Sequence, residues 1–214
     1  MNRRPCRNRC LRGLLVDFGG VLTTNVFASF ATFCREAGLD ADHVKQLFRS
    51  DAEARTLLED LETGALSEPD FELAFGRRLG LPPDGLIAGL FAHIRPEPKM
   101  VEAVAAARER GIVTGLLSNS WGLATDYDTL GDIFDARVIS AEEGMRKPDP
   151  RIYPLAAERM GLEPQEIVFV DDLGFNLKPA KQLGMATVLH EDPDRTVAEL
   201  ESLLGVPLRS APAS

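Results

Sequence analysis

The chain has 214 residues, of which 44% are hydrophobic, and its formal net charge is −9 at pH 7. This length allows one sizeable core with room for a smaller second domain. The negative charge argues against a general nucleic-acid-binding protein, which needs a basic surface to neutralise phosphates. No apolar run approaches the roughly 18 residues that a membrane-spanning helix needs, so we expect no membrane partner and a cytoplasmic location.

The N-terminal residues 1–11 are basic and predict a flexible tail, without the apolar centre of a signal peptide. The first strand is predicted over residues 12–18, RGLLVDF, because an apolar run is bounded there by Gly and Asp. This strand brings a single carboxylate, Asp17, to its end. Gly19 and Gly20 follow directly, and we expect them to let the chain turn sharply.

Residues 24–95 have apolar residues at helical spacing and contain no convincing strand. They predict a helical domain inserted after the first strand. The chain then returns to the α/β core, which we expect to comprise residues 12–23 and 96–208.

The rest of the chain alternates between predicted helices and strands. Four more strands are expected, at 112–118, 136–140, 167–172 and 186–190. Helices are expected between them, at 96–111, 148–161 and 175–184, with Pro154 and Pro179 in first turns or bends. The alternation predicts an α/β fold, a doubly wound, Rossmann-like parallel sheet with an inserted α-helical cap domain.

Polar residues occupy the ends of three predicted strands. These are Asp17, the pair Ser118 and Asn119, and the pair Asp171 and Asp172. Ligands of open parallel sheets bind beyond the carboxyl ends of the strands, so we expect these side chains to lie close together. Each residue alone is equally consistent with a cap or a turn.

The combination of these residues indicates a metal and phosphate site. Carboxylates that converge at one edge repel each other unless a cation lies among them, and Mg²⁺ takes oxygen ligands and binds phosphates. Lys147, which follows the third strand, offers a second positive charge, and Ser118 offers a hydroxyl donor.

The order Asp17, Ser118, Lys147, Asp171-Asp172 resembles the four signature motifs of the haloacid dehalogenase superfamily of phosphohydrolases. The segments RKPDPRIY (146–153) and IVFVDDLGFNLKPAKQLGMATVL (167–189) resemble the N-terminal phosphatase domain of soluble epoxide hydrolases. The resemblance implies that the helical insertion is the family's cap.

The resemblance also implies a role for each residue. Asp17 would be the nucleophile that forms an aspartyl-phosphate. Ser118 and Asn119 would bind the substrate, and Lys147 would screen the charge between Asp17 and the phosphate. The ligands of Mg²⁺ would be Asp17, the carbonyl of Gly19, Asp172 directly and Asp171 through water; Asn176 would brace the loop of the acidic pair.

Gly19 departs from the family pattern. The first motif normally carries a second acid at this position, which protonates the leaving oxygen and later activates water. A glycine cannot transfer a proton, and general acid–base catalysis is typically worth about 10²–10⁴ in rate.

Three hypotheses remain open. The first is a Mg²⁺-dependent phosphohydrolase that acts on a small phosphorylated metabolite with a good leaving group. The second is a non-catalytic or regulatory protein that binds a phosphometabolite on a degenerate scaffold. The third is a 2-haloacid dehalogenase, in which Asp17 displaces halide without an acid. A monomer or homodimer is expected in each case, and the aromatics of the insertion are expected to form mainly its own core.

Overall fold

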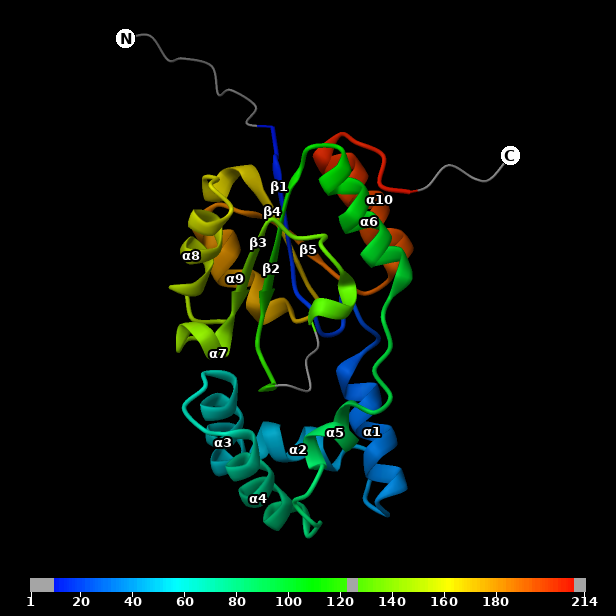
Figure 1. The fold of residues 1–214 in the computed structure, drawn as a ribbon, viewed down its shortest axis with the longest axis vertical. Coiled ribbons are helices and arrows are strands. Elements are labelled where there is room, and N and C mark those ends of the chain that lie inside the picture. Colours follow the sequence, from blue (N-terminus) through cyan, green and yellow to red (C-terminus); the bar gives the residue numbers. More distant parts are fainter. Residues whose placement is uncertain (1–9, 123–126, 210–214) are drawn as a thin grey trace, which may run out of the picture.

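A computed structural model describes residues 10–122 and 127–209 of the chain (Figure 1). Its centre is a five-stranded sheet with the order β3-β2-β1-β4-β5, in which every neighbouring pair is parallel. The strands are β1 (Gly13–Val16), β2 (Val113–Ser118), β3 (Ala136–Ile139), β4 (Ile167–Asp171) and β5 (Ala186–Leu189). All five predicted strands are therefore present, and no strand end differs from the predicted one by more than two residues.

Helices cover both faces of the sheet. One face carries α6 (Pro98–Glu109) and α10 (Pro193–Leu204), and the other carries α8 (Ile152–Arg159) and α9 (Gly174–Leu183) (Figure 1). Residues of β1 alternate between the two sides, because Leu14 and Val16 pack in one apolar cluster and Leu15 packs in the other. The expected doubly wound α/β fold is confirmed.

Short elements complete the core: α7 (Ser140–Glu143) and the 3₁₀ turns Tyr127–Leu130 and Pro164–Glu166. Pro154 lies in the first turn of α8, as expected, since a missing N–H costs nothing there. The expectation for Pro179 was wrong, because this residue lies inside α9, which continues past it to Leu183.

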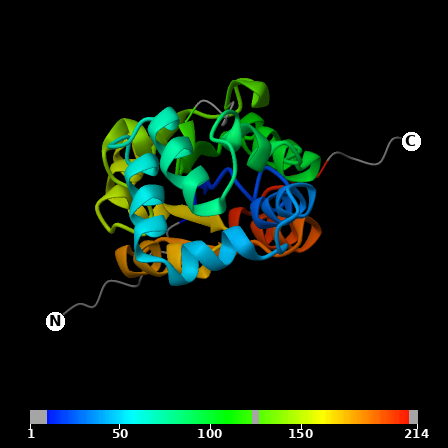
Figure 2. The ribbon, with the colours of Figure 1, turned by 90° about the horizontal axis from the view of Figure 1, so that it is seen from below.

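The insertion is entirely helical in its regular elements, and its helices form an apolar cluster of their own. They are α1 (Val26–Glu36), α2 (His43–Ser50), α3 (Ala52–Glu62), α4 (Glu68–Leu79) and α5 (Leu86–Phe91). Seen from the side of the insertion, these helices lie in front of the sheet (Figure 2). Trp121, which follows β2 in the core, packs into this cluster and contributes to joining the two parts.

The chain leaves and re-enters the core through two segments that pair with each other. Thr23 and Pro96 form an isolated antiparallel bridge, and the N–H of Thr24 donates to the carbonyl of Arg95 (2.8 Å). The N–H of Glu97 in turn donates to the carbonyl of Leu22 (2.8 Å). We propose this pairing as the boundary between the core and the insertion, near the limits 24–95 that the sequence predicts.

Among the described residues, no helix is long and apolar enough to cross a bilayer.

Candidate active site

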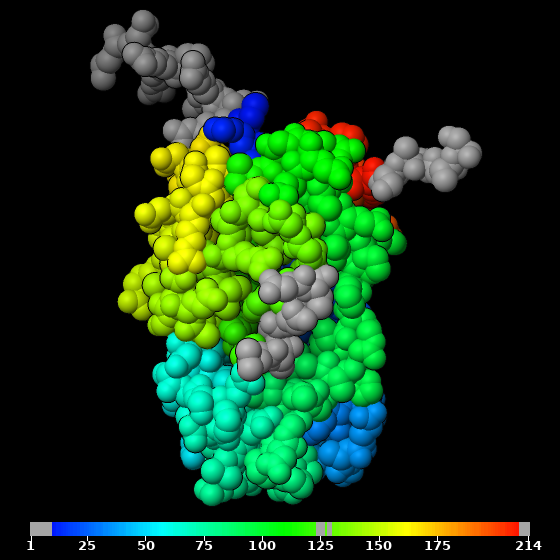
Figure 3. All heavy atoms as spheres, viewed as in Figure 1, coloured from blue at the N-terminus to red at the C-terminus, as the bar shows by residue number. Residues whose placement is uncertain are grey.

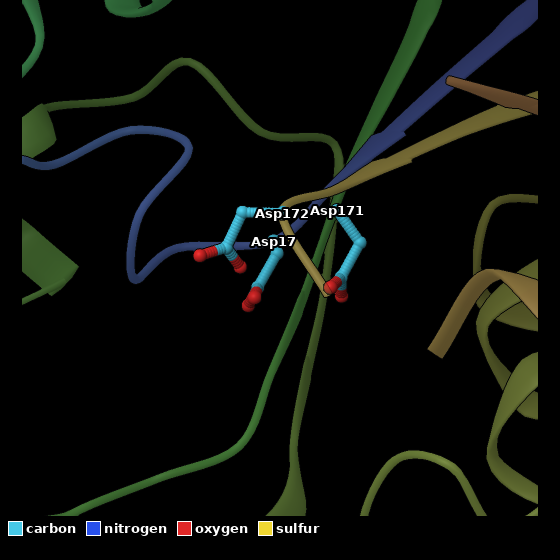
Figure 4. Close-up of side chains that lie close together, drawn as sticks. All are labelled: Asp17, Asp171 and Asp172. Atoms are coloured by element: carbon cyan, nitrogen blue, oxygen red, sulfur yellow. The ribbon is translucent and has the colours of Figure 1, made fainter. Parts of the chain in front are cut away.

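The carboxylates at the ends of β1 and β4 meet at one edge of the sheet. Asp17 directly follows β1, and its N–H donates to the carbonyl of Val170 on β4 (2.9 Å), which places it beside Asp171 and Asp172. Figure 4 shows the three side chains reaching into the same region. Each offers one oxygen such that these atoms all lie within 4.8 Å of one another. The convergence that the strand order predicts is therefore present.

Lys147 contacts two of these three acids and is only 1% exposed. Its Nζ is 2.7 Å from Oδ1 of Asp17 and 2.8 Å from Oδ2 of Asp171. Burial alone lowers the pKa of a lysine, but the two carboxylates outweigh burial and hold the pKa of Lys147 above its usual value. The side chain is therefore a permanent ammonium group at the edge of the sheet.

One ammonium group does not compensate three carboxylates. Burial raises the pKa of Asp17 above its ordinary range; Lys147 opposes this rise, whereas Asp171 and Asp172 add to it. Burial, together with the charge of Asp171, raises the pKa of Asp172 to about 6. The site therefore has an excess of negative charge that a divalent cation would relieve.

The two acids of the β4 end have different surroundings. Both oxygens of Asp171 already accept hydrogen bonds, from the N–H of Leu173 (2.8 Å), from Nδ2 of Asn176 (3.0 and 3.1 Å) and from Lys147. Asp172 is less buried and has no such set of donors among the described residues. Asp171 thus orients Lys147, and Asn176 in turn braces Asp171, which agrees with the expected bracing of this loop. The contact of Asp171 with a metal through water stays a prediction.

Ser118 and Asn119 lie at the end of β2, beside β1. Ser118 is 2% exposed, and its Oγ accepts a hydrogen bond from the hydroxyl of Tyr127 (3.0 Å). Asn119 holds the backbone of Lys147 on both sides: its Oδ1 accepts from the N–H (2.9 Å), and its Nδ2 donates to the carbonyl (3.0 Å). Asn119 therefore fixes the position of Lys147, and its contact with substrate stays a prediction.

The two glycines after Asp17 have different functions. Gly20 has a φ of +80°, and a Cβ there would lie 2.4 Å from Oδ2 of Asp172, so a side chain at this position would collide with the proposed metal ligand. Gly19 does not have a positive φ, and a Cβ there would meet only Cγ2 of Val26, at 3.0 Å. Of the two glycines expected to let the chain turn sharply, Gly20 is the one with left-handed backbone geometry, and Gly19 leaves space beside the nucleophile.

A cavity of about 320 Å³ lies over these residues, between the sheet edge and the insertion. From the core it is lined by all the predicted site residues except Asp171, together with Phe18, Trp121, Arg146, Leu173, Phe175 and Asn176. From the insertion it is lined mainly by apolar side chains, namely Val26, Phe27, Phe30, Phe48, Leu58 and Phe91, and by the polar residues Lys45, Arg49 and Glu62.

Glu62 and Arg146 are two of the polar lining residues that sequence reasoning did not connect to the site. Glu62 is 5% exposed, whereas two other acids of its helix, Glu53 and Glu59, are exposed. Its Oε2 lies 2.5 Å from Nε of Arg146 and accepts a hydrogen bond from Asn119 (3.1 Å). In the sequence, only the position of Arg146 next to Lys147 pointed to the site. That position does not reveal that Arg146 pairs with Glu62 on a helix far away in the sequence.

Comparison with protein-family models shows to which family this chain belongs. The model of the haloacid dehalogenase-like hydrolase family matches residues 11–184. The chain belongs to this family. The fold, the order of the site residues and their meeting at the carboxyl edge of the sheet agree with the resemblance seen in the sequence.

The curated proteins similar to this chain include two that are named phosphatases. Bifunctional epoxide hydrolase 2 of Sus scrofa is 30% identical over 95% of this chain, which spans only 40% of that protein. Glyceraldehyde 3-phosphate phosphatase of Methanopyrus kandleri is 31% identical over 72% of this chain and 70% of its own length. Sesquiterpene phosphatase astK of Aspergillus oryzae is 30% identical over 69% of this chain and 79% of its own length.

Solved structures similar to this chain share its fold. A family enzyme of Bacteroides thetaiotaomicron, crystallised with magnesium and inorganic phosphate, is 23% identical, with a TM-score of 0.64 over 85% of this chain and 94% of its own. A dehalogenase has the same TM-score at 24% identity, over 91% of this chain and 97% of its own. The fold alone therefore does not distinguish phosphatase from dehalogenase chemistry.

Proposed function

We propose that this protein is a Mg²⁺-dependent phosphohydrolase that hydrolyses a phosphate monoester through an aspartyl-phosphate on Asp17. The observation that carries the proposal is the contact of Asp17 with the buried ammonium of Lys147, beside the freer carboxylate of Asp172. A 2-haloacid dehalogenase needs no metal, so dehalogenase chemistry does not explain why the site carries the additional negative charge of Asp172.

The donor set fits Mg²⁺. It consists of oxygen atoms, it is negatively charged, and the charges that raise the pKa of Asp172 are those that a divalent ion would compensate. Asp17, Asp172 and the carbonyl of Gly19 would hold the ion, and Asp171 would act through Lys147 or water. When bound, Mg²⁺ neutralises negative charge on the phosphoryl oxygens.

The side chains of Asp17, Lys147 and Ser118 have different roles in the proposed reaction. Oδ1 of Asp17 is engaged by Lys147 and by the N–H of Phe18 (2.7 Å), and Oδ2 accepts no hydrogen bond from the described residues. Oδ2 is thus the oxygen available for attack on phosphorus. Lys147 stabilises the negative charge that develops on the phosphoryl group, and the hydroxyl of Ser118 donates to one of its oxygens.

The cavity indicates the class of alcohol that the ester carries. The phosphate end is polar, whereas the wall contributed by the insertion is largely aromatic, with Phe27, Phe30, Phe48 and Phe91. One phosphatase relative is named for a polar substrate and the other for an apolar one, so the relatives do not indicate the substrate class. The residues that line the cavity are therefore the basis for the inference. We infer that the substrate is a monophosphate of an apolar alcohol, because aromatic walls bind apolar groups by the hydrophobic effect.

The test is release of inorganic phosphate from a panel of phosphate monoesters, with Mg²⁺ and with EDTA. We expect turnover with Mg²⁺ that is abolished in Asp17→Asn and is faster for benzyl phosphate than for glycerol phosphate. Asp149→Asn is the matched control, since Asp149 pairs with Arg151 at the surface and does not line the cavity. No phosphate release from any ester would overturn the proposal, and halide release from 2-chloropropionate would replace it with the dehalogenase.

Gly19 favours a second candidate, a protein that binds a phosphorylated metabolite without hydrolysing it, because the usual acid is missing there. This candidate predicts that phosphate esters raise the melting temperature by binding the folded state while no phosphate is released. Turnover that depends on Asp17 excludes it.

A further inference from the structure

One carboxylate of the cavity has no role in the proposed function so far. Of the described residues that line the cavity, Asp17, Asp172 and Glu62 are acids. Asp17 is the proposed nucleophile and Asp172 a proposed metal ligand. Glu62 comes from the insertion, at the last turn of α3, and is almost completely buried.

The backbone around Glu62 is held against the core. The hydroxyl of Ser140 donates to the carbonyl of Glu62, and the same hydroxyl accepts from the N–H of Ser120 (2.8 Å). Gly64 approaches the core so closely that a Cβ there would lie 2.7 Å from the carbonyl oxygen of Ala141. Figure 3 shows the surface of the α3 segment against the surface around α7. The position of Glu62 relative to the sheet edge is therefore fixed by the backbone.

The side chain of Glu62 is connected to both loops that handle the phosphate. Its carboxylate accepts from Nδ2 of Asn119, the residue after Ser118, and the same amide group holds the carbonyl of Lys147. The contact with Arg146 is close, but Nε of Arg146 makes no well-aligned hydrogen bond with it. The guanidinium thus favours the charged form of Glu62 without locking it.

The surroundings allow both forms of the Glu62 carboxyl near neutral pH. Burial raises the pKa of Glu62 to about 7, against the lowering effects of Arg146 and Lys147 and of hydrogen bonds from Trp121 and Asn119. Other charged groups near it are Glu59 on its own helix, whose Oε1 is 3.5 Å from Arg146, and Lys45 and Arg49, which line the cavity from α2. A group with such a pKa is suited to give and take a proton.

We propose that Glu62 supplies the general acid and base that Gly19 lacks, so that the insertion completes the catalytic site. This inference rests on the proposed phosphohydrolase function. In the first step, Asp17 forms a bond to phosphorus, the bond from phosphorus to the alcohol oxygen breaks, and that oxygen keeps the electron pair and takes the proton of Glu62. In the second step, ionised Glu62 takes a proton from water as the water oxygen bonds to phosphorus, and the electron pair of the broken bond returns to Asp17. Alcohol and inorganic phosphate leave, and both carboxyl groups return to their initial forms.

The test compares wild type with Glu62→Gln, which keeps the size of the side chain and an acceptor for Asn119. The two substrates are benzyl phosphate, whose leaving alkoxide needs a proton, and p-nitrophenyl phosphate, whose leaving phenolate does not. With p-nitrophenyl phosphate we expect a burst of one nitrophenolate per enzyme at the wild-type rate, followed by slow turnover, because only the hydrolysis of the aspartyl-phosphate lacks its base. With benzyl phosphate we expect no burst and a loss of about 10²–10⁴ in kcat.

Glu59→Gln is the matched control, because it removes a carboxylate beside Arg146 from the same helix without reaching the cavity. We expect it to retain the wild-type kinetics, and Glu62→Asp to retain part of the activity on benzyl phosphate. If Glu62→Gln hydrolyses benzyl phosphate like an active wild type, or slows the burst and the benzyl reaction equally, the inference is overturned and the phosphohydrolase function stands. If wild type releases no phosphate from either ester, both fail together.

Discussion

Nζ of Lys147 lies 2.7 Å from Oδ1 of Asp17, and both side chains are nearly inaccessible to solvent. This ion pair links the segment after α7 to the end of β1, and a second contact links Lys147 to Asp171 at the end of β4. The ammonium group therefore holds together two acids that would otherwise repel each other. Its removal has consequences for stability as well as for catalysis.

We expect Lys147→Met to destabilise the protein by about 3–5 kcal/mol, because the change leaves buried carboxylates without a partner. It should also lower kcat by about 10²–10³, the usual effect of losing one group that stabilises transition-state charge. Urea unfolding and phosphate release measure the two effects. Lys99→Met is the control, because Lys99 forms a solvent-exposed pair with Asp194 and such pairs contribute little to stability.

Gly20→Ala should weaken Mg²⁺ binding, because the added methyl group would collide with the carboxylate of Asp172. Gly80→Ala is the control for backbone strain without a collision. Gly80 also has a positive φ, +69°, but a Cβ there meets nothing within 4 Å. Both variants should lose about 1 kcal/mol of stability from backbone strain. Only Gly20→Ala should require more Mg²⁺ for half-maximal activity, and equal Mg²⁺ requirements would contradict the proposed role of Asp172.

Gly19→Asp should restore part of the benzyl phosphatase activity that Glu62→Gln loses, since it returns an acid to the first motif. The new Cβ would lie 3.0 Å from Cγ2 of Val26, so the rescue should be larger when Val26→Ala is also present. The measurement is kcat for benzyl phosphate in the double and triple variants. Gly19→Asn, which fits the same space but carries no acid, is the control and should not rescue.

The stability of the metal-free protein should fall as the pH rises from about 4 to above 6. The pKa of Asp172 increases on folding from 3.8 to about 6, and that of Asp17 also increases, so the folded state binds more protons than the unfolded state in this range. Stability then decreases with pH. Mg²⁺ competes with these protons, so the gain in melting temperature that it produces should increase with pH. Melting curves with EDTA and with Mg²⁺ test this, and Asp172→Asn should reduce both trends.

Phe175→Ala should raise KM for an apolar ester with little loss of stability. Phe175 lines the cavity next to the acidic pair, yet it is 57% exposed and contributes little to the core. A bound apolar group would cover it, and a loss of about 1.4 kcal/mol corresponds to a tenfold weaker affinity. The control is Leu203→Ala, an exposed residue of α10 outside the cavity lining. An unchanged KM for benzyl phosphate would argue against an apolar substrate.

The core of the site could be predicted because it depends on local pattern. Each strand is a short apolar run, and its last residue carries the chemistry, so the parallel order of the strands brings Asp17, Ser118 and Asp172 together without further information. Lys147 was a candidate from its place after the third strand, but its direct contact with Asp17 could not be predicted, because it lies in a connection between elements.

The part contributed by the insertion could not be predicted. Its aromatic residues have the helical spacing of an ordinary core, and the sequence does not distinguish those that pack inward from those that reach the cavity. Glu62 belongs to a helix with several other acids, and its burial results from the docking of α3 on Ser140 and Ala141. Such docking is a long-range contact, which local propensity does not encode.

The two chain connections between the helical insertion and the sheet lie side by side, paired at Thr23–Thr24 and Arg95–Glu97. The five strands and their pairings involve only residues outside the stretch between these two segments. Evolution or an engineer can therefore exchange the intervening helices as one module, altering selectivity while the phosphoryl-transfer residues of the sheet stay in place. If Glu62 has the role inferred above, each new module must also bring its own proton donor, and this requirement limits which modules yield a working enzyme.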